Sequence, residues 1–200
     1  MSKQGVTAIR IALWGLVFLA LVALLWVRVI APRLEQDVTA SLGRGDYQLT
    51  STDGGTFTED SLKGAPSAVF FGFTHCPEVC PTTLGDIATW QEGLGEAGQE
   101  LRVFFVTVDP ERDTAEQLEQ YVSWVPGVLG VSGSREEMDK AIKAFRIYAR
   151  QVPLDDGGYT MDHSAMVLLF DEGGEYAGLI NYQEDYDRAL GKLRALVGVS

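Results

Sequence analysis

The chain has 200 residues and a formal net charge of −12, because 28 acidic residues outnumber 16 Lys and Arg. All 28 acidic residues follow residue 34, so the main part of the chain cannot attract nucleic acid by charge, and we expect no nucleic-acid partner. The sequence shows no internal repeat and no low-complexity tract, which leaves one compact domain of ordinary size as the expectation.

The N-terminal region is a candidate membrane span. Residues 11–31 are apolar apart from Arg28, and Trp14 and Trp26 stand near the two ends, where indole rings favour the membrane interface. A cleaved signal peptide is the alternative, but its apolar region is usually shorter and this segment lacks a clear A-x-A cleavage site. We therefore expect a cytoplasmic N-terminus (1–10), an uncleaved transmembrane signal anchor (11–31), a linker (32–44) and one domain (45–200).

Predicted strands and helices then alternate along the domain. Residues 47–50 and 56–58 flank a turn at 53–55 and predict a hairpin. Runs rich in Val and Phe at 68–73 and 101–108 predict buried strands. The apolar spacing from Leu84 to Leu94 predicts a helix between these two strands.

The second half of the domain begins with two helix starts. Thr114–Gln117 and Ser134–Glu137 are capping boxes, residues 165–170 and 175–180 predict a hairpin, and Asp185 begins a last helix. The order β-α-β-α-α-β-β-α predicts an α/β protein with a thioredoxin-like fold. A right-handed β-α-β crossover would leave the loop after strand 68–73 at the carboxyl edge of the sheet, where such proteins place their sites.

The only two cysteines, Cys76 and Cys80, follow that strand directly. If the backbone coils there, their Cα atoms lie about 6 Å apart, so the pair can bind a soft metal as thiolates or close as a disulfide. A purely structural disulfide is the alternative, although a loop of about five residues constrains the unfolded chain little. Because Pro81 disfavours a helical Cys80, we expect the second sulfur on an exposed turn before a helix, whose N-terminus favours the thiolate.

Of the two histidines, His163 is the candidate third ligand. In the predicted topology the loop before strand 165–170 packs against the cysteine loop. Two thiolates and one imidazole suit copper in either oxidation state; zinc is the second candidate, although structural zinc usually takes four protein ligands. We expect His75 at the surface or in a supporting hydrogen bond, and Met161 in packing.

The segment Asp109–Thr114, which follows strand 101–108, has two interpretations. It can be a strand-to-helix connection in which Pro110 keeps the chain extended and Thr114 caps the helix. It can also form an acidic rim for a partner, or hydrogen bonds around a metal. The local pattern fits both.

Three motifs together resemble the Sco/SenC family of membrane-anchored copper proteins: Phe73–Pro81, Val108–Thr114 and Asp162–Ser164. The resemblance extends from about residue 45 to the end, and Glu78 stands where many members have Asp. It implies a thioredoxin-like fold, Cu(I) or Cu(II) bound by Cys76, Cys80 and His163, and help in assembling the copper A centre of cytochrome c oxidase subunit II.

The resemblance also implies a location and a chemistry. It implies a single-pass membrane protein whose soluble domain lies in the bacterial periplasm, or in the equivalent mitochondrial intermembrane space, with another periplasmic copper chaperone as a candidate donor. A metallochaperone is the main expectation. The alternative is a thiol–disulfide oxidoreductase with Cys76 and Cys80 as catalytic residues, acting on the copper A cysteines or in redox signalling. A peroxidase needs one low-pKa cysteine and has no use for the pair or for His163.

Overall fold

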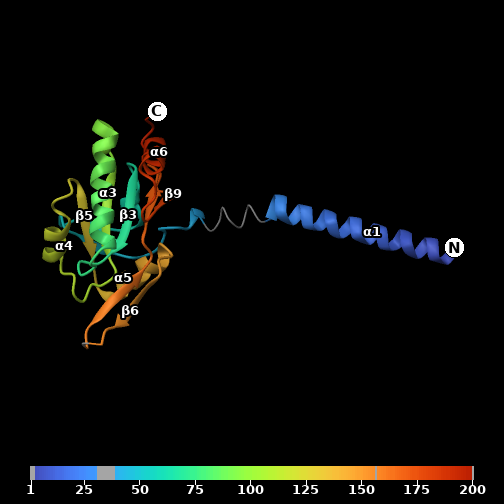
Figure 1. Ribbon diagram of the computed structural model, residues 1–200, viewed down its shortest axis with the longest axis horizontal. Coiled ribbons are helices and arrows are strands. Elements are labelled where there is room, and N and C mark those ends of the chain that lie inside the picture. Colours follow the sequence, from blue (N-terminus) through green and yellow to red (C-terminus); the bar gives the residue numbers. More distant parts are fainter. Residues whose placement is uncertain (1–2, 31–38, 156, 200) are drawn as a thin grey trace. The chain divides into compact units, whose positions relative to one another are not determined.

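The computed structural model describes residues 3–30, 39–155 and 157–199 (Figure 1). They belong to two compact units that divide between Ser41 and Leu42. The first unit contains the helix α1 (Lys3–Leu25), which continues as the π-helix η1 (Trp26–Ile30). The stretch Leu13–Ile30 is long and apolar enough to cross a membrane, as either an anchor or a signal sequence would be. Ala31 and the predicted linker up to residue 38 lie outside the described residues.

The second unit is built on a mixed sheet with the strand order β2-β1-β5-β4-β3-β8-β9. Strands β3, β4 and β5 run parallel, whereas β8 runs antiparallel to β3 and pairs with β9. Two further strands, β6 and β7, pair as a separate hairpin. The strands are β1 (Leu49–Ser51), β2 (Thr56–Phe57), β3 (Ser67–Gly72), β4 (Arg102–Thr107), β5 (Val128–Ser132), β6 (Ala149–Pro153), β7 (Tyr159–His163), β8 (Met166–Phe170) and β9 (Tyr176–Asn181).

Helices cover both faces of this sheet, which explains why its central strands are apolar throughout. On one face Phe70 packs on Phe105, whose ring also meets Tyr121 of α4. On the other face Phe71 packs on Phe145 at the end of α5. Helices α3 and α6 lie side by side (Figure 1). The helices are α3 (Val79–Leu94), α4 (Ala115–Val122), α5 (Arg135–Ala144) and α6 (Tyr186–Leu196), with short 3-10 turns η2 (Glu59–Leu62) and η3 (Gly95–Gln99).

The thioredoxin-like α/β fold predicted from the sequence is confirmed, with two additions. The sequence pattern did not predict strand β5, or the hairpin β6–β7. A capping box is present at Thr114, but at Ser134 only half of one forms. There the carboxylate of Glu137 accepts a hydrogen bond from the backbone N–H of Gln48 at 2.7 Å, so it ties α5 to the residues before β1.

Candidate metal centre

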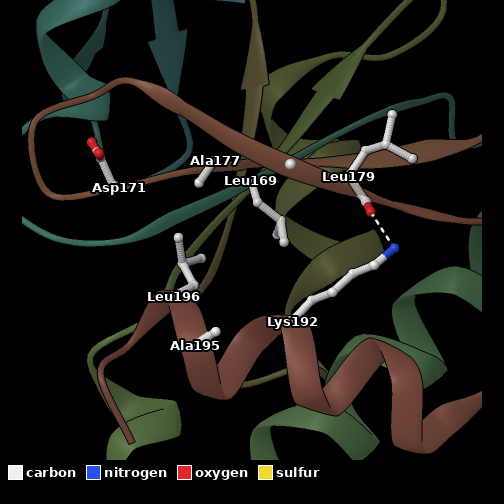
Figure 2. A pocket seen from close by; sticks show the side chains of 8 residues that line it. Leu169, Asp171, Ala177, Leu179, Lys192, Ala195 and Leu196 are labelled. Atoms are coloured by element: carbon white, nitrogen blue, oxygen red, sulfur yellow. Dashed lines mark hydrogen bonds between the residues drawn. The ribbon is translucent and has the colours of Figure 1, made fainter.

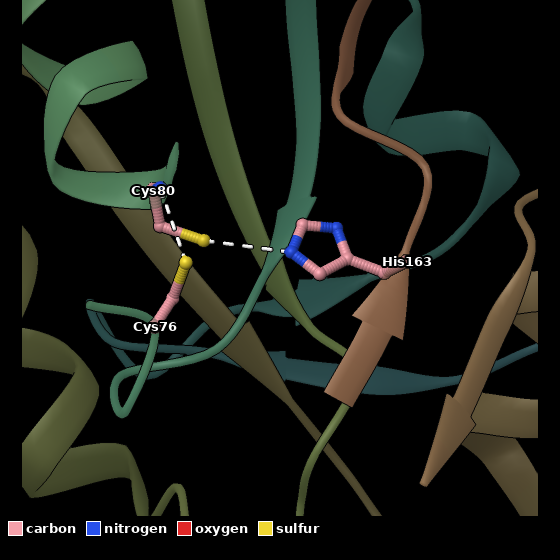
Figure 3. A group of neighbouring side chains, drawn as sticks. All are labelled: Cys76, Cys80 and His163. Carbon is pink, nitrogen blue, oxygen red and sulfur yellow. Dashed lines mark hydrogen bonds between the residues drawn. The ribbon is translucent and has the colours of Figure 1, made fainter. Parts of the chain in front are cut away.

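Segments far apart in the sequence meet at the carboxyl end of β3 (Figure 3). Cys76 lies on the loop after β3, Cys80 in the first turn of α3, and His163 at the end of β7. Because β8 runs antiparallel to β3, the chain that leaves β7 and enters β8 must pass the end of β3. One sulfur from each cysteine and one imidazole nitrogen all lie within 4.8 Å of one another. The prediction that His163 approaches the two sulfurs is confirmed.

The expectation that Cys80 lies on an exposed turn is wrong. Helix α3 begins at Val79, so Cys80 is helical, and its side chain is 0% exposed. Pro81 is tolerated because it falls in the first turn, where a backbone N–H has no partner within the helix. The sulfur is buried because it packs against the end of β3 at Gly72, a contact that no local sequence rule indicates.

The two sulfurs are chemically unequal. The backbone N–H of Cys80 points at Cys76 Sγ at 3.3 Å. Hydrogen bonding with the Cys80 thiol is the largest cause that lowers the pKa of Cys76, to about 4. The same hydrogen bond, followed by burial, raises the pKa of Cys80 far above its usual range. The two shifts favour the thiolate at Cys76 and the thiol at Cys80, and both cysteines are free.

The imidazole of His163 is oriented by the backbone of the next residue. Its Nδ1 lies 2.9 Å from the carbonyl oxygen of Ser164, and because a carbonyl can only accept, Nδ1 carries a proton. Its Nε2 lies 3.7 Å from Cys80 Sγ and is the nitrogen available to a metal (Figure 3). The ring of Phe73 meets the imidazole edge-on, with centroids 5.7 Å apart. This arrangement fits the tautomer that a metal-binding histidine needs.

A buried carboxylate holds the cysteine loop in place. Asp113 is fully buried and accepts hydrogen bonds from the backbone N–H of Thr74 at 3.0 Å and from its hydroxyl at 2.6 Å. The hydroxyl of Thr107, at the end of β4, donates to the same carboxylate at 2.5 Å. The interpretation of Asp109–Thr114 as a source of hydrogen bonds around a metal included Asp113 but did not single it out. Its only signal was the proximity of both threonines to strand ends.

The other residues considered as ligands lie where they were expected. The side chain of His75 is 49% exposed, and its Nδ1 lies 3.0 Å from the hydroxyl of Thr74. Met161 is buried in the hydrophobic core. Neither residue belongs to the Cys–Cys–His group.

A separate pocket of about 510 Å³ lies between the strands β8 and β9 and the helix α6 (Figure 2). Its single ammonium group, on Lys192, already donates to the carbonyl oxygen of Leu179 at 2.8 Å. Cys76, Cys80 and His163 do not line it. The pocket is mostly apolar and offers no donor set for a soft metal.

Comparisons with known proteins identify relatives over most of the chain. The SCO1/SenC family model matches residues 35–198. "Protein SCO2, mitochondrial" of Saccharomyces cerevisiae is 30% identical over 176 residues, which are 84% of this chain and 58% of that protein. "Protein SCO2 homolog, mitochondrial" of Danio rerio is 35% identical over 158 residues, 77% of this chain and 57% of that protein. The chain thus spans just over half the length of these relatives.

Two solved structures are similar over nearly their whole length. "Structure of Bradyrhizobium japonicum ScoI with copper bound" is 40% identical, covers 78% of this chain and 99% of that chain, and has a TM-score of 0.70. "Crystal Structure of Yeast Sco1 with Copper Bound" is 32% identical, covers 80% of this chain and 90% of that chain, and has a TM-score of 0.71.

Proposed function

The chain belongs to the SCO1/SenC family, and from that premise we propose that it is a copper chaperone whose metal ligands are Cys76, Cys80 and His163. The observation that carries the proposal is the convergence of two sulfurs and one imidazole nitrogen within 4.8 Å. This soft donor set suits copper in either oxidation state. Two similar structures are described with copper bound, which supports the choice of metal. With three protein ligands, an incoming ligand can bind before the others leave.

The proposal extends to a destination. We place delivery at the copper A centre of cytochrome c oxidase subunit II, with another periplasmic copper chaperone as the donor. Helix α1 would anchor the protein as a single-pass membrane protein, with the metal centre in the periplasm or the mitochondrial intermembrane space. The apolar length of Leu13–Ile30 supports the anchor.

An anaerobic titration of the reduced protein with Cu(I), in competition with a chromophoric chelator, tests the ligands. We expect one copper per chain, loss of most binding in Cys76→Ser and Cys80→Ser, and weaker binding in His163→Ala. His75→Ala is the matched control, because His75 precedes Cys76 in the sequence but does not belong to the Cys–Cys–His group. It should bind like the parent. Parent-like binding by all three ligand variants would place the site elsewhere.

The inequality of the sulfurs favours thiol–disulfide exchange as a second function. The Cys76 thiolate would attack a target disulfide, form a mixed disulfide and release one target thiolate. Cys80 would then lose its proton and attack Cys76 Sγ, which forms the Cys76–Cys80 disulfide and releases the second thiolate. Two electrons pass to the target, and a thiol reductant must restore the pair. This disulfide would consume both thiolates that copper needs, so oxidation and loading should exclude each other.

Cells can distinguish the two functions. His163→Ala keeps both thiols, so it impairs a chaperone but leaves an oxidoreductase intact. If the chaperone function dominates, cells that carry His163→Ala should have as little active cytochrome oxidase as cells that carry Cys76→Ser. Added copper should partly restore the oxidase activity of the His163→Ala cells. Full oxidase activity in His163→Ala with none in Cys76→Ser would make thiol exchange the essential function.

A further inference from the structure

The hairpin β6–β7, which carries His163, makes few contacts with the other helices and strands of the described chain. Along β7 the side chains of Tyr159, Met161 and His163 alternate with exposed or partly exposed neighbours and so share one face of the strand. Met161 is buried in the core, and His163 faces the sulfurs, so this face is turned toward the domain. The attachment of Tyr159 therefore bears directly on the position of His163.

Tyr159 is held by Asp109 and Arg112 from the loop between β4 and α4. Its hydroxyl donates to Asp109 Oδ1 at 2.8 Å. Arg112 Nη1 donates to the carbonyl oxygen of Tyr159 at 2.9 Å, and the guanidinium carbon lies 3.8 Å from the centroid of the Tyr159 ring. Arg112 Nε donates to the second oxygen of Asp109, whose side chain is fully buried. One arginine thus clamps both the backbone and the ring of the first residue of β7.

The chemistry of this clamp requires arginine. A planar guanidinium can lie flat on an aromatic ring and still donate in its own plane, whereas a lysine ammonium is a point charge and cannot do both. The buried carboxylate of Asp109 uses one oxygen for Arg112 and the other for the Tyr159 hydroxyl, so both partners are fixed by one anion.

We infer that Asp109, Arg112 and Tyr159 are positioning residues that anchor β7 and thereby hold His163 beside the two sulfurs. The four residue steps from Tyr159 to His163 span about 13 Å of extended strand. Pairing with β6 stiffens this strand along its whole length. The inference rests on the proposed function only where copper binding is measured, because the attachment of β7 is a property of the metal-free protein.

The first test uses the metal-free protein. Arg112→Lys and the milder Tyr159→Phe should speed amide hydrogen exchange in β7 about tenfold or more, while exchange in the central strands β3 and β4 stays unchanged. Arg150→Lys is the matched control. Arg150 belongs to the same hairpin, but its side chain is exposed and its ion pair with Asp162 is long, at 4.0 Å. It should exchange like the parent. Unchanged exchange in β7, or equal acceleration across the whole domain, would overturn the inference.

The second test is a double-mutant cycle on Cu(I) affinity. Arg112→Lys should weaken binding about tenfold in the parent, the size of effect known for residues that support a ligand, but less than twofold in the His163→Ala background. Equal losses in both backgrounds would mean that Arg112 does not act through His163 and would overturn the inference. If the parent and His163→Ala bind copper alike, the proposed histidine ligand fails, and hydrogen exchange alone then decides on the anchor.

Discussion

The sulfur of Cys80 lies against the backbone of Gly72, where a Cβ atom would stand 2.8 Å from Sγ. The same Cβ atom would also stand 2.7 Å from the ring of Phe105. Both distances are shorter than real Cβ contacts, and both neighbours are buried, so neither can move aside freely. The glycine at the end of β3 makes room for the buried sulfur.

We predict that Gly72→Ala displaces Cys80 Sγ and weakens Cu(I) binding about tenfold or more, with a loss of stability of about 1–3 kcal/mol from overpacking. Chelator competition and urea denaturation measure the two effects. Gly85→Ala, in the middle of α3, is the control, because a Cβ there meets nothing within 4 Å. It should bind copper normally and gain up to about 1 kcal/mol of helix stability. Parent-like copper binding by Gly72→Ala would refute the steric role.

The lowered pKa of Cys76, about 4, predicts an unusual pH profile for alkylation. An ordinary thiol, with a pKa of about 8.5, reacts roughly tenfold faster per pH unit up to that value. Cys76 is already a thiolate above its own pKa, so its rate with iodoacetamide should change little between about pH 6 and pH 8. Mass spectrometry of the reduced, metal-free protein follows each cysteine.

Cys80 supplies the contrast in the same experiment. It is fully buried, so Cys76→Ser should leave a protein that alkylates very slowly while folded and rapidly in urea. A rate at Cys76 that climbs about tenfold per pH unit over the same range would contradict the assignment of the thiolate to Cys76.

Asp113→Asn should destabilise the domain by about 2–3 kcal/mol, because hydrogen bonds to a buried charged group are worth more than neutral ones. The amide also presents N–H groups to the donors of Thr74 and Thr107. Urea denaturation measures the loss. Asp187→Asn, an exposed change of the same kind in the first turn of α6, should cost well under about 1 kcal/mol. Equal losses in the two variants would show that the buried network contributes nothing special.

Membrane fractionation tests the anchor. The full-length protein should stay in the membrane pellet after carbonate extraction, whereas a chain that begins at Leu42, the start of the second unit, should be soluble and still bind copper. Recovery of a soluble natural form that begins near residue 32 would show that the segment is a cleaved signal.

Local patterns predicted the central strands and the helices because these elements are defined by apolar periodicity. They missed β5, where Gly130 interrupts the apolar run; a Cβ there would stand 2.9 Å from Leu118 of α4, so the glycine serves close packing. They missed the hairpin β6–β7 because residues such as Arg150 and Gln151 are exposed and carry no hydrophobic alternation.

The candidate metal centre was likewise predictable only in part from the sequence. Topology was enough to bring His163 near the cysteines, because strand order determines which loops meet. Burial of Cys80 was not predictable from Pro81, since it depends on the neighbouring strand at Gly72. The capping role of Thr114 was visible locally, whereas the contact of Asp113 with Thr74 joins residues 39 positions apart and exists only in the folded chain.

The unequal exposure of the two sulfurs would set an order for ligand replacement at the proposed copper site. Cys80 Sγ is enclosed by the core, whereas Cys76 and His163 are partly exposed. If these three side chains hold copper as proposed, an acceptor's thiol or imidazole would reach the ion from the side of Cys76 and His163 and would displace these two ligands first. Cys80 would then be the last ligand to dissociate, so the ion would stay bound to this protein until the acceptor has bound it.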